Sequence, residues 1–286
     1  MKKIVRTGVL LLFLSHFTVI GKAQELYIQT EPASNMPAKS LGIRLSNKYF
    51  PKSSQDQFRI SPELMYGISS KLMIHVKQSF NFTTENEYKP GMLNFYAKYR
   101  FLSIDEIQKH TRIAAFASIG YSNSQELAGV HDLMESNTGY SSGIIITQLW
   151  HKLALSSTLV VFKRLANKNY DQIGDLGMIY NYSLSAGYLL LPLKYKNYRQ
   201  ANLNLYVELL GTRNELKNYE ETHVHKSEDI TQKFRRDQVM LAPGLQTILG
   251  SRTRIEAGYL FPLVNSKYSQ GENMVMLRFE HLLFLH

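Results

Sequence analysis

The sequence of 286 residues contains no cysteine and a single tryptophan. Without a thiol the chain cannot form disulfides, thiolate metal sites or a cysteine nucleophile. It also lacks long apolar runs after its first 23 residues, where the longest ones, residues 187–193 and 144–147, fall far short of the roughly 20 residues that a spanning helix needs. These absences exclude a disulfide-stapled secreted domain and a helical membrane protein.

The chain is instead rich in residues that favour strands. It has 18 tyrosines and 14 phenylalanines, and 44% of its residues are hydrophobic. Aromatic, leucine, isoleucine and valine residues recur in short segments that are separated by polar stretches with glycine or asparagine. This pattern indicates an all-β protein, which is either a soluble protein or a membrane barrel.

The first 23 residues have the features of a secretory signal. Basic residues, Lys2, Lys3 and Arg6, precede an apolar stretch over residues 9–20, and residues 21–23 form a small-x-small cleavage site. No cysteine follows, which excludes a lipoprotein. We therefore predict cleavage and export into the envelope of a Gram-negative bacterium.

Cleavage leaves residues 24–286 as one domain, the predicted barrel. It removes four cations and no acid, so the net charge falls from +10 to +6. Much of the net positive charge thus belongs to the signal. The charge of the whole chain is therefore weak support for nucleic acid as a partner.

Period-2 alternation along the mature chain predicts twelve strands. Most are about ten residues long, the length that a tilted strand needs to cross the hydrocarbon layer, whereas strands of soluble sandwiches are nearer five or six. The predicted strands cover residues 40–48, 58–68, 71–82, 92–101, 112–121, 140–150, 152–162, 175–190, 202–210, 238–248, 252–261 and 274–285.

The connections between these strands alternate between short and long. The long charged segments, such as residues 122–138, 164–174, 212–237 and 262–273, all follow odd-numbered strands. A barrel with both termini in the periplasm has short turns on that side and long loops outside. Two links on the periplasmic side, residues 103–111 and 191–201, are longer than this rule expects.

Alternation also separates an apolar face from a charged face. A soluble sandwich would alternate in the same way, so alternation does not distinguish the two classes. We predict an antiparallel transmembrane β-barrel with about twelve strands and periplasmic termini, because the strands are numerous and long and the loops are asymmetric. Nine cations and four anions are predicted to line its lumen: Arg44, Lys48, Arg59, Lys77, Lys98, Arg100, Arg112, Arg254 and Arg278, against Glu63, Glu208, Glu256 and Glu280.

Two stretches carry a more specific likeness. They are residues 24–27 (QELY) with residues 31–40 (EPASNMPAKS), and residues 197–211 (NYRQANLNLYVELLG). The chain resembles outer-membrane β-barrels of Bacteroidota that are grouped with the "MetA-pathway of phenol degradation" family of presumed transporters. The resemblance implies an outer-membrane barrel and a transport role, and it supplies no catalytic residue.

Residues 212–237 offer two other chemistries. His223 and His225 lie on one side of an extended segment among acidic residues, a composition that could hold zinc or copper, although such exposed pairs are more often only solvated. His225 and Ser227 have the His-x-Ser spacing of outer-membrane lipid hydrolases, but they lie in a loop and Glu228 follows. Neither pattern compels an enzyme.

The sequence therefore predicts a porin-like channel or transporter for small solutes, not an enzyme, with outer-membrane lipid as its partner and with no cofactor or metal. Basic residues lining a pore favour anions. Two alternatives stay open. One is an ion-paired, filled barrel with a structural or adhesive role, and the other is a barrel-borne lipid hydrolase. The solute and the oligomeric state are not specified.

Overall fold

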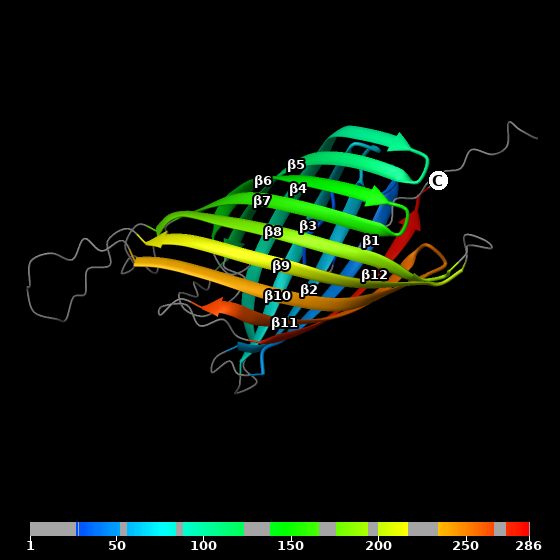
Figure 1. The fold of residues 1–286 in the computed structure, drawn as a ribbon. Coiled ribbons are helices and arrows are strands. Elements are labelled where there is room, and N and C mark those ends of the chain that lie inside the picture. Colours follow the sequence, from blue (N-terminus) through cyan, green and yellow to red (C-terminus); the bar gives the residue numbers. More distant parts are fainter. Residues whose placement is uncertain are drawn as a thin grey trace, which may run out of the picture.

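The computed structural model describes residue 27 and residues 29–51, 56–83, 88–122, 138–165, 176–193, 200–216, 234–265 and 273–285. These residues form twelve strands around one barrel (Figure 1). The strands are β1 (Ser40–Tyr49), β2 (Asp56–Gly67), β3 (Leu72–Thr83), β4 (Tyr88–Glu106), β5 (Lys109–Ser122), β6 (Gly139–Trp150), β7 (Leu153–Arg164), β8 (Leu176–Leu191), β9 (Asn202–Leu216), β10 (Phe234–Leu249), β11 (Thr253–Asn265) and β12 (Met274–Phe284).

Each strand pairs antiparallel with the next one, and β1 pairs with β12 to close the barrel. At the closure Ser40 lies opposite Phe284, and Tyr49 lies opposite Val275. Closure leaves none of the twelve described strands with a free edge, so the backbone groups of the wall are paired within the wall. The prediction of an all-β, antiparallel, twelve-stranded transmembrane barrel is confirmed.

The outer face of the wall is apolar around its whole circumference. Where the strands form this face, side chains alternate between exposed and buried positions, as in β7. Every strand presents at least one large exposed hydrophobic residue: Ile43, Leu64, Val76, Phe95, Ile119, Ile144, Leu159, Leu184, Val207, Leu245, Ile255 and Leu277. A continuous apolar belt of this kind is stable against lipid and not against water. The described residues form no helix that is long and apolar enough to cross a membrane.

The two ends of the barrel differ. At one end β1 begins, β12 ends and short turns join β2 to β3, β4 to β5, β6 to β7 and β10 to β11; we name it the turn end. The link at this end from Leu191 of β8 to Asn202 of β9 is longer, as the sequence predicts. We name the opposite end the loop end. The β4–β5 turn contradicts the expectation of a long link over residues 103–111. Both strands continue there, with Ser103 opposite Arg112, and Gln108 completes a tight turn at a φ of 60°.

Strands also extend further at the loop end than the sequence predicts. The segment of residues 212–237, expected to be entirely loop, begins and ends in strand. In the β9–β10 ladder Thr212 pairs with Gln238, and Leu216 pairs with Phe234. The strand pairing depends on main-chain hydrogen bonds, so it continues beyond the apolar belt. The side chains there no longer alternate between apolar and polar.

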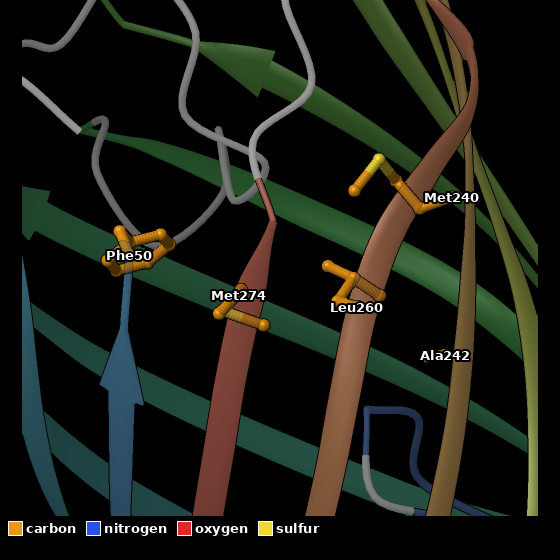
Figure 2. Packing of buried hydrophobic residues seen from close by; sticks show 5 residues of the cluster. All are labelled: Phe50, Met240, Ala242, Leu260 and Met274. Atoms are coloured by element: carbon orange, nitrogen blue, oxygen red, sulfur yellow. The ribbon is translucent and has the colours of Figure 1, made fainter. Parts of the chain in front are cut away.

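Hydrophobic side chains also pack inside the barrel. Near the loop end, Phe50 just beyond β1 forms a buried cluster with residues of β10, β11 and β12 (Figure 2). The other members are Met240, Ala242, Leu260 and Met274. The interior is therefore not lined by polar groups alone.

Candidate functional site

The chain that precedes β1 runs inside the barrel. We name residues 29–39 the luminal segment. Ala33 is 0% exposed, and it packs with Ala114 of β5 and Ile145 of β6. Met36 packs with Met65 of β2 and Met73 of β3. The segment therefore crosses from the β5–β6 wall to the β2–β3 wall.

Two prolines favour an irregular backbone in this segment. Pro32 and Pro37 lack the N–H that a ladder needs. At the turn end the segment lies directly against the wall, because Gly67 has no side chain. A Cβ atom placed there would overlap the carbonyl oxygen of Pro37. Lys39 then donates its N–H to the Gly67 carbonyl at 2.7 Å, and β1 begins.

Charged side chains of the wall hold the backbone of the luminal segment. The Glu208 carboxylate accepts the N–H groups of Gln29 at 2.7 Å and Thr30 at 3.0 Å, and the Thr30 hydroxyl at 2.7 Å. From the opposite wall the Lys98 ammonium donates to the carbonyls of Pro32 at 2.6 Å and Ser34 at 2.8 Å. The Glu208 carboxylate thus accepts hydrogen bonds from the N–H groups of the segment, and the Lys98 ammonium donates hydrogen bonds to its carbonyl groups.

Three further contacts involve the segment or Tyr27 just before it. Thr147 Oγ1 accepts the Ala33 N–H at 2.9 Å. Arg112 donates to Ser34 Oγ at 2.8 Å, and Arg278 donates to the carbonyl of Tyr27 at 2.7 Å. These bonds stabilise the irregular segment, since each buried polar group that is left unpaired costs about 1–3 kcal/mol.

Glu31 of the luminal segment joins a buried ionic network. Its carboxylate lies 2.6 Å from Arg44 Nη1 and 3.6 Å from Lys98 Nζ. Arg44 also contacts Glu63 at 3.2 Å and Glu280 at 2.8 Å. One guanidinium therefore links the segment to β1, β2 and β12.

The network continues on both sides of Arg44. His75 Nδ1 lies 2.7 Å from Glu63, and the His75 ring lies against Tyr96, with 4.9 Å between the ring centroids. On the other side Glu280 also contacts Arg254.

A second ion pair lies beside this network. Arg278 of β12 contacts Glu256 of β11, and Gln246 of β10 donates to the same carboxylate. Interior charges on β11 and β12 are therefore also neutralised in pairs.

The remaining residues that the sequence singles out lie in three places. Arg59 is 1% exposed and donates to Asn81 at 2.7 Å. Lys48 is buried opposite Arg59 in the β1–β2 ladder, and Lys77 is half-buried opposite Glu63 in the β2–β3 ladder. Arg100 is half-buried at the turn end, where it donates to the Ser70 carbonyl at 2.9 Å.

A cavity of about 310 Å³ lies between the luminal segment and the loop end. Its walls differ in charge. On β1, β2, β3 and β12, which we name the charged side, it is lined by Arg44, Lys48, Glu63, His75, Lys77 and Arg278, with Glu31 beneath. On β5 to β8, which we name the uncharged side, the described lining includes Phe116, Ser118, Ser141, Ile145, Thr158, Val160, Phe162, Asn181 and Ser183.

Sequence reasoning missed Glu31, His75 and Thr147. His75 and Thr147 follow the alternation of their strands, so their inward direction could have been read from it. Glu31 belongs to no strand. The signals for its segment are two prolines, no alternation between the apolar leader and β1, and the likeness carried by residues 31–40.

The candidate metal and hydrolase residues His223, His225 and Ser227 lie outside the described residues. Within the described part of the chain, no group of three or more histidine, aspartate or glutamate side chains could hold a metal ion.

Comparisons with known proteins report only structural likeness. No protein-family model matches the sequence, and no curated protein matches it. A crystal structure of the NanC porin is similar with 11% identity and a TM-score of 0.45, over 86% of this chain and 100% of that one. OccK5 (OpdH) of Pseudomonas aeruginosa is similar with 9% identity and a TM-score of 0.40, over 84% of this chain; this chain spans 63% of the length of OccK5.

The OmpF protein of Salmonella typhi, in a complex with daunomycin, is similar with 8% identity and a TM-score of 0.36, over 85% of this chain and 96% of that one.

Proposed function

We propose that the protein is an outer-membrane channel for small solutes, of the Bacteroidota family that it resembles, and that the luminal segment forms its constriction. Residues 1–23 would direct export and be removed. The barrel would act on no substrate chemically and would need no cofactor. Its partners would be outer-membrane lipid and the solute.

One observation carries this proposal. A cavity of about 310 Å³ occupies the lumen, and its floor is formed by Gln29, Thr30 and Glu31 of a segment that is not part of the wall. The segment is attached by hydrogen bonds and ion pairs, which can exchange with water, and not by a strand ladder. A solute that enters the cavity meets a floor that is separable from the barrel.

The proposed channel favours anions. Four cationic side chains, Arg44, Lys48, Lys77 and Arg278, line the cavity against the carboxylates of Glu31 and Glu63, among the described residues. Fixed positive charge in a narrow aqueous lumen concentrates anions, most strongly at low salt because the screening length shrinks as salt rises.

Single-channel recording in a planar bilayer tests the constriction. In wild type the luminal segment should keep the conductance small. Lys98→Ala with Glu208→Ala removes the cation and the acid that hold the segment, and we expect the conductance to rise severalfold. The matched control is Glu106→Ala with Lys109→Ala, an exposed ion pair 3.6 Å long at the β4–β5 turn. It removes the same two kinds of charge and should leave the conductance unchanged.

The direction of selectivity is measured in a salt gradient. Wild type should give a reversal potential of the sign expected for anions, and Lys48→Glu with Lys77→Glu should shift it toward cations. A reversal potential that indicates cation selectivity in wild type would contradict the anion preference. The proposal of a channel would not be affected by that result.

A non-conducting structural barrel is the second candidate. The observation in its favour is that Arg44, Lys98 and Glu208 connect the luminal segment to walls all around the lumen. If neither wild type nor the Lys98→Ala, Glu208→Ala variant conducts while both are folded, this candidate replaces the channel.

A further inference from the structure

We propose that the luminal cavity binds a pyranose-type sugar, whose hydroxyl groups are received by Thr158, Ser183 and His75. This inference rests on the proposed function and deepens it by naming a class of solute for the same cavity. It commits to recognition of hydroxyl groups on a ring with an apolar C–H face, and not to recognition of charge.

Two hydroxyl groups on the uncharged side of the cavity lack partners. Thr158 of β7 and Ser183 of β8 lie directly opposite each other in the ladder, line the cavity and are 8% and 6% exposed. Neither Thr158 Oγ1 nor Ser183 Oγ has a hydrogen-bond partner among the described residues. Buried polar side chains are usually hydrogen-bonded, so this pair is suited to a hydrogen-bonding group that enters the cavity.

A comparable pair of hydroxyls nearby shows the other arrangement. Ser118 of β5 and Ser141 of β6 also lie opposite each other and also line the cavity, but their Oγ atoms are hydrogen-bonded at 2.7 Å. Facing hydroxyls of this wall can therefore satisfy each other. Because Thr158 and Ser183 do not, each can still donate to a ligand hydroxyl and accept from one.

A nitrogen atom on the charged side is also without a partner. His75 is 3% exposed and lines the cavity, and its Nδ1 atom lies 2.7 Å from a carboxylate oxygen of Glu63. Its Nε2 atom has no hydrogen-bond partner among the residues that the structure describes. When the ring is neutral and Nδ1 donates to Glu63, Nε2 accepts; when the ring is charged, both nitrogens donate. A hydroxyl group pairs with Nε2 in either form, whereas a carboxylate or an ammonium group pairs with only one of them.

Three rings in a row give the same cavity an aromatic wall. His75 of β3, Tyr96 of β4 and Phe116 of β5 all line it, with 4.9 Å between the first two ring centroids and 5.2 Å between the last two. The Phe116 ring lies close against the wall because Gly143, directly opposite it, has no side chain; a Cβ atom there would lie 2.6 Å from Phe116 Cε1. Aromatic surface beside a few hydrogen-bonding groups suits a sugar ring, since its C–H groups pack on the apolar surface while its hydroxyls are hydrogen-bonded.

Saturation-transfer NMR of the full chain in lipid nanodiscs tests the inference, with empty nanodiscs as the blank. The probes are the methyl α-pyranosides of glucose, galactose and mannose, and at least one of them should bind saturably. Cyclohexanol, which has a six-membered ring and a single hydroxyl, should bind at least tenfold more weakly than the best of them. If none of the three binds saturably, water alone occupies these groups and the inference is overturned. Equal or tighter binding of cyclohexanol would also overturn it.

A double variant tests the hydroxyl pair. Thr158→Val with Ser183→Ala removes both hydroxyls and should weaken the best pyranoside at least tenfold. The matched control is Ser157→Ala, which removes a hydroxyl from the opposite face of β7 and should bind as wild type does. Wild-type affinity in the double variant would contradict the proposed site.

His75→Asn tests the other contact. An asparagine amide keeps an N–H donor near the position of Nδ1 for Glu63 and removes the Nε2 atom. Affinity for the best pyranoside should fall severalfold while the barrel still folds. Unchanged affinity would contradict the role of His75 in the site.

Binding is measured without current, so its outcome is separable from that of the channel. Binding without conductance would support the ligand class and reject the channel. Conductance without binding of any pyranoside would support the channel and reject the ligand class. If the variants fail to fold, the comparison of the pyranosides with cyclohexanol on wild type still decides.

Discussion

On the charged side of the lumen Arg44 contacts three carboxylates, whereas on the uncharged side Thr147 of β6 and Ser156 of β7 meet through a single hydroxyl pair at 2.9 Å. Loss of Arg44 on the charged side removes one partner from each of three buried carboxylates. Loss of one group on the uncharged side affects only its immediate partner. The charged side is therefore cooperative, and the uncharged side is a set of local contacts.

Arg44→Met should produce the largest effect, because it leaves Glu31, Glu63 and Glu280 without the cation that they share. Breaking a buried pair in this way costs about 3–5 kcal/mol. We expect the free energy of unfolding, measured by denaturant titration in phospholipid micelles, to fall by about that amount. A loss below about 1 kcal/mol would show that the network contributes little, and the contrast between the two sides would fail.

A disulfide between the luminal segment and the wall tests whether the floor of the cavity moves. The chain has no native cysteine, so Ala33→Cys with Ala114→Cys places one thiol on the segment and one on β5, within one buried cluster. In the Lys98→Ala, Glu208→Ala background, oxidation should return the raised conductance to the wild-type level, and reduction should raise it again. If the conductance is the same in the oxidised and the reduced protein, the ions do not pass the luminal segment.

Two threonines on the uncharged side give a matched pair of intermediate size. Thr147 Oγ1 accepts the Ala33 N–H, whereas Thr158 Oγ1 has no hydrogen-bond partner among the described residues. Thr147→Val should cost about 1–3 kcal/mol because it strands a buried N–H. Thr158→Val should be neutral or stabilising. Equal losses in denaturant titration would show that the luminal segment does not depend on this bond.

The smallest effect is expected at the exposed turn. Glu106 and Lys109 form an ion pair of 3.6 Å whose side chains are 59% and 47% exposed. Such pairs contribute about 0.2–1 kcal/mol. Replacing both with alanine should change the free energy of unfolding by less than about 1 kcal/mol, and a larger change would place the turn among the cooperative parts of the barrel.

The wall could be predicted from the sequence because its pattern is local. In β7, residues of alternating character follow one another, and the structure alternates exposed and buried along the same residues. Errors occur where the pattern stops and the hydrogen-bond ladder continues, as beyond Thr212 and around the Ile107–Gln108 turn. The alternation of apolar and polar side chains marks the part of each strand that faces lipid. A part of a strand outside the lipid shows no such alternation.

The contents of the lumen could not be predicted in this way. Glu31 lies only thirteen residues before Arg44, but Arg44 meets Glu280 across 236 positions of sequence, and that contact exists only because β1 pairs with β12. The attachment of Thr30 to Glu208 spans 178 positions. Nothing in the irregular stretch around Pro32 specifies which wall it will contact.

By itself, the sequence determined the number of strands, the apolar outer face and the cations and acids available to the inner face, because alternation is a property of neighbouring residues. The tertiary structure alone decided that Arg44 joins three carboxylates, that Lys98 and Glu208 hold the luminal segment, and that one side of the cavity is charged and the other is not. These contacts depend on barrel closure and strand register, which bring together residues that are distant in the chain.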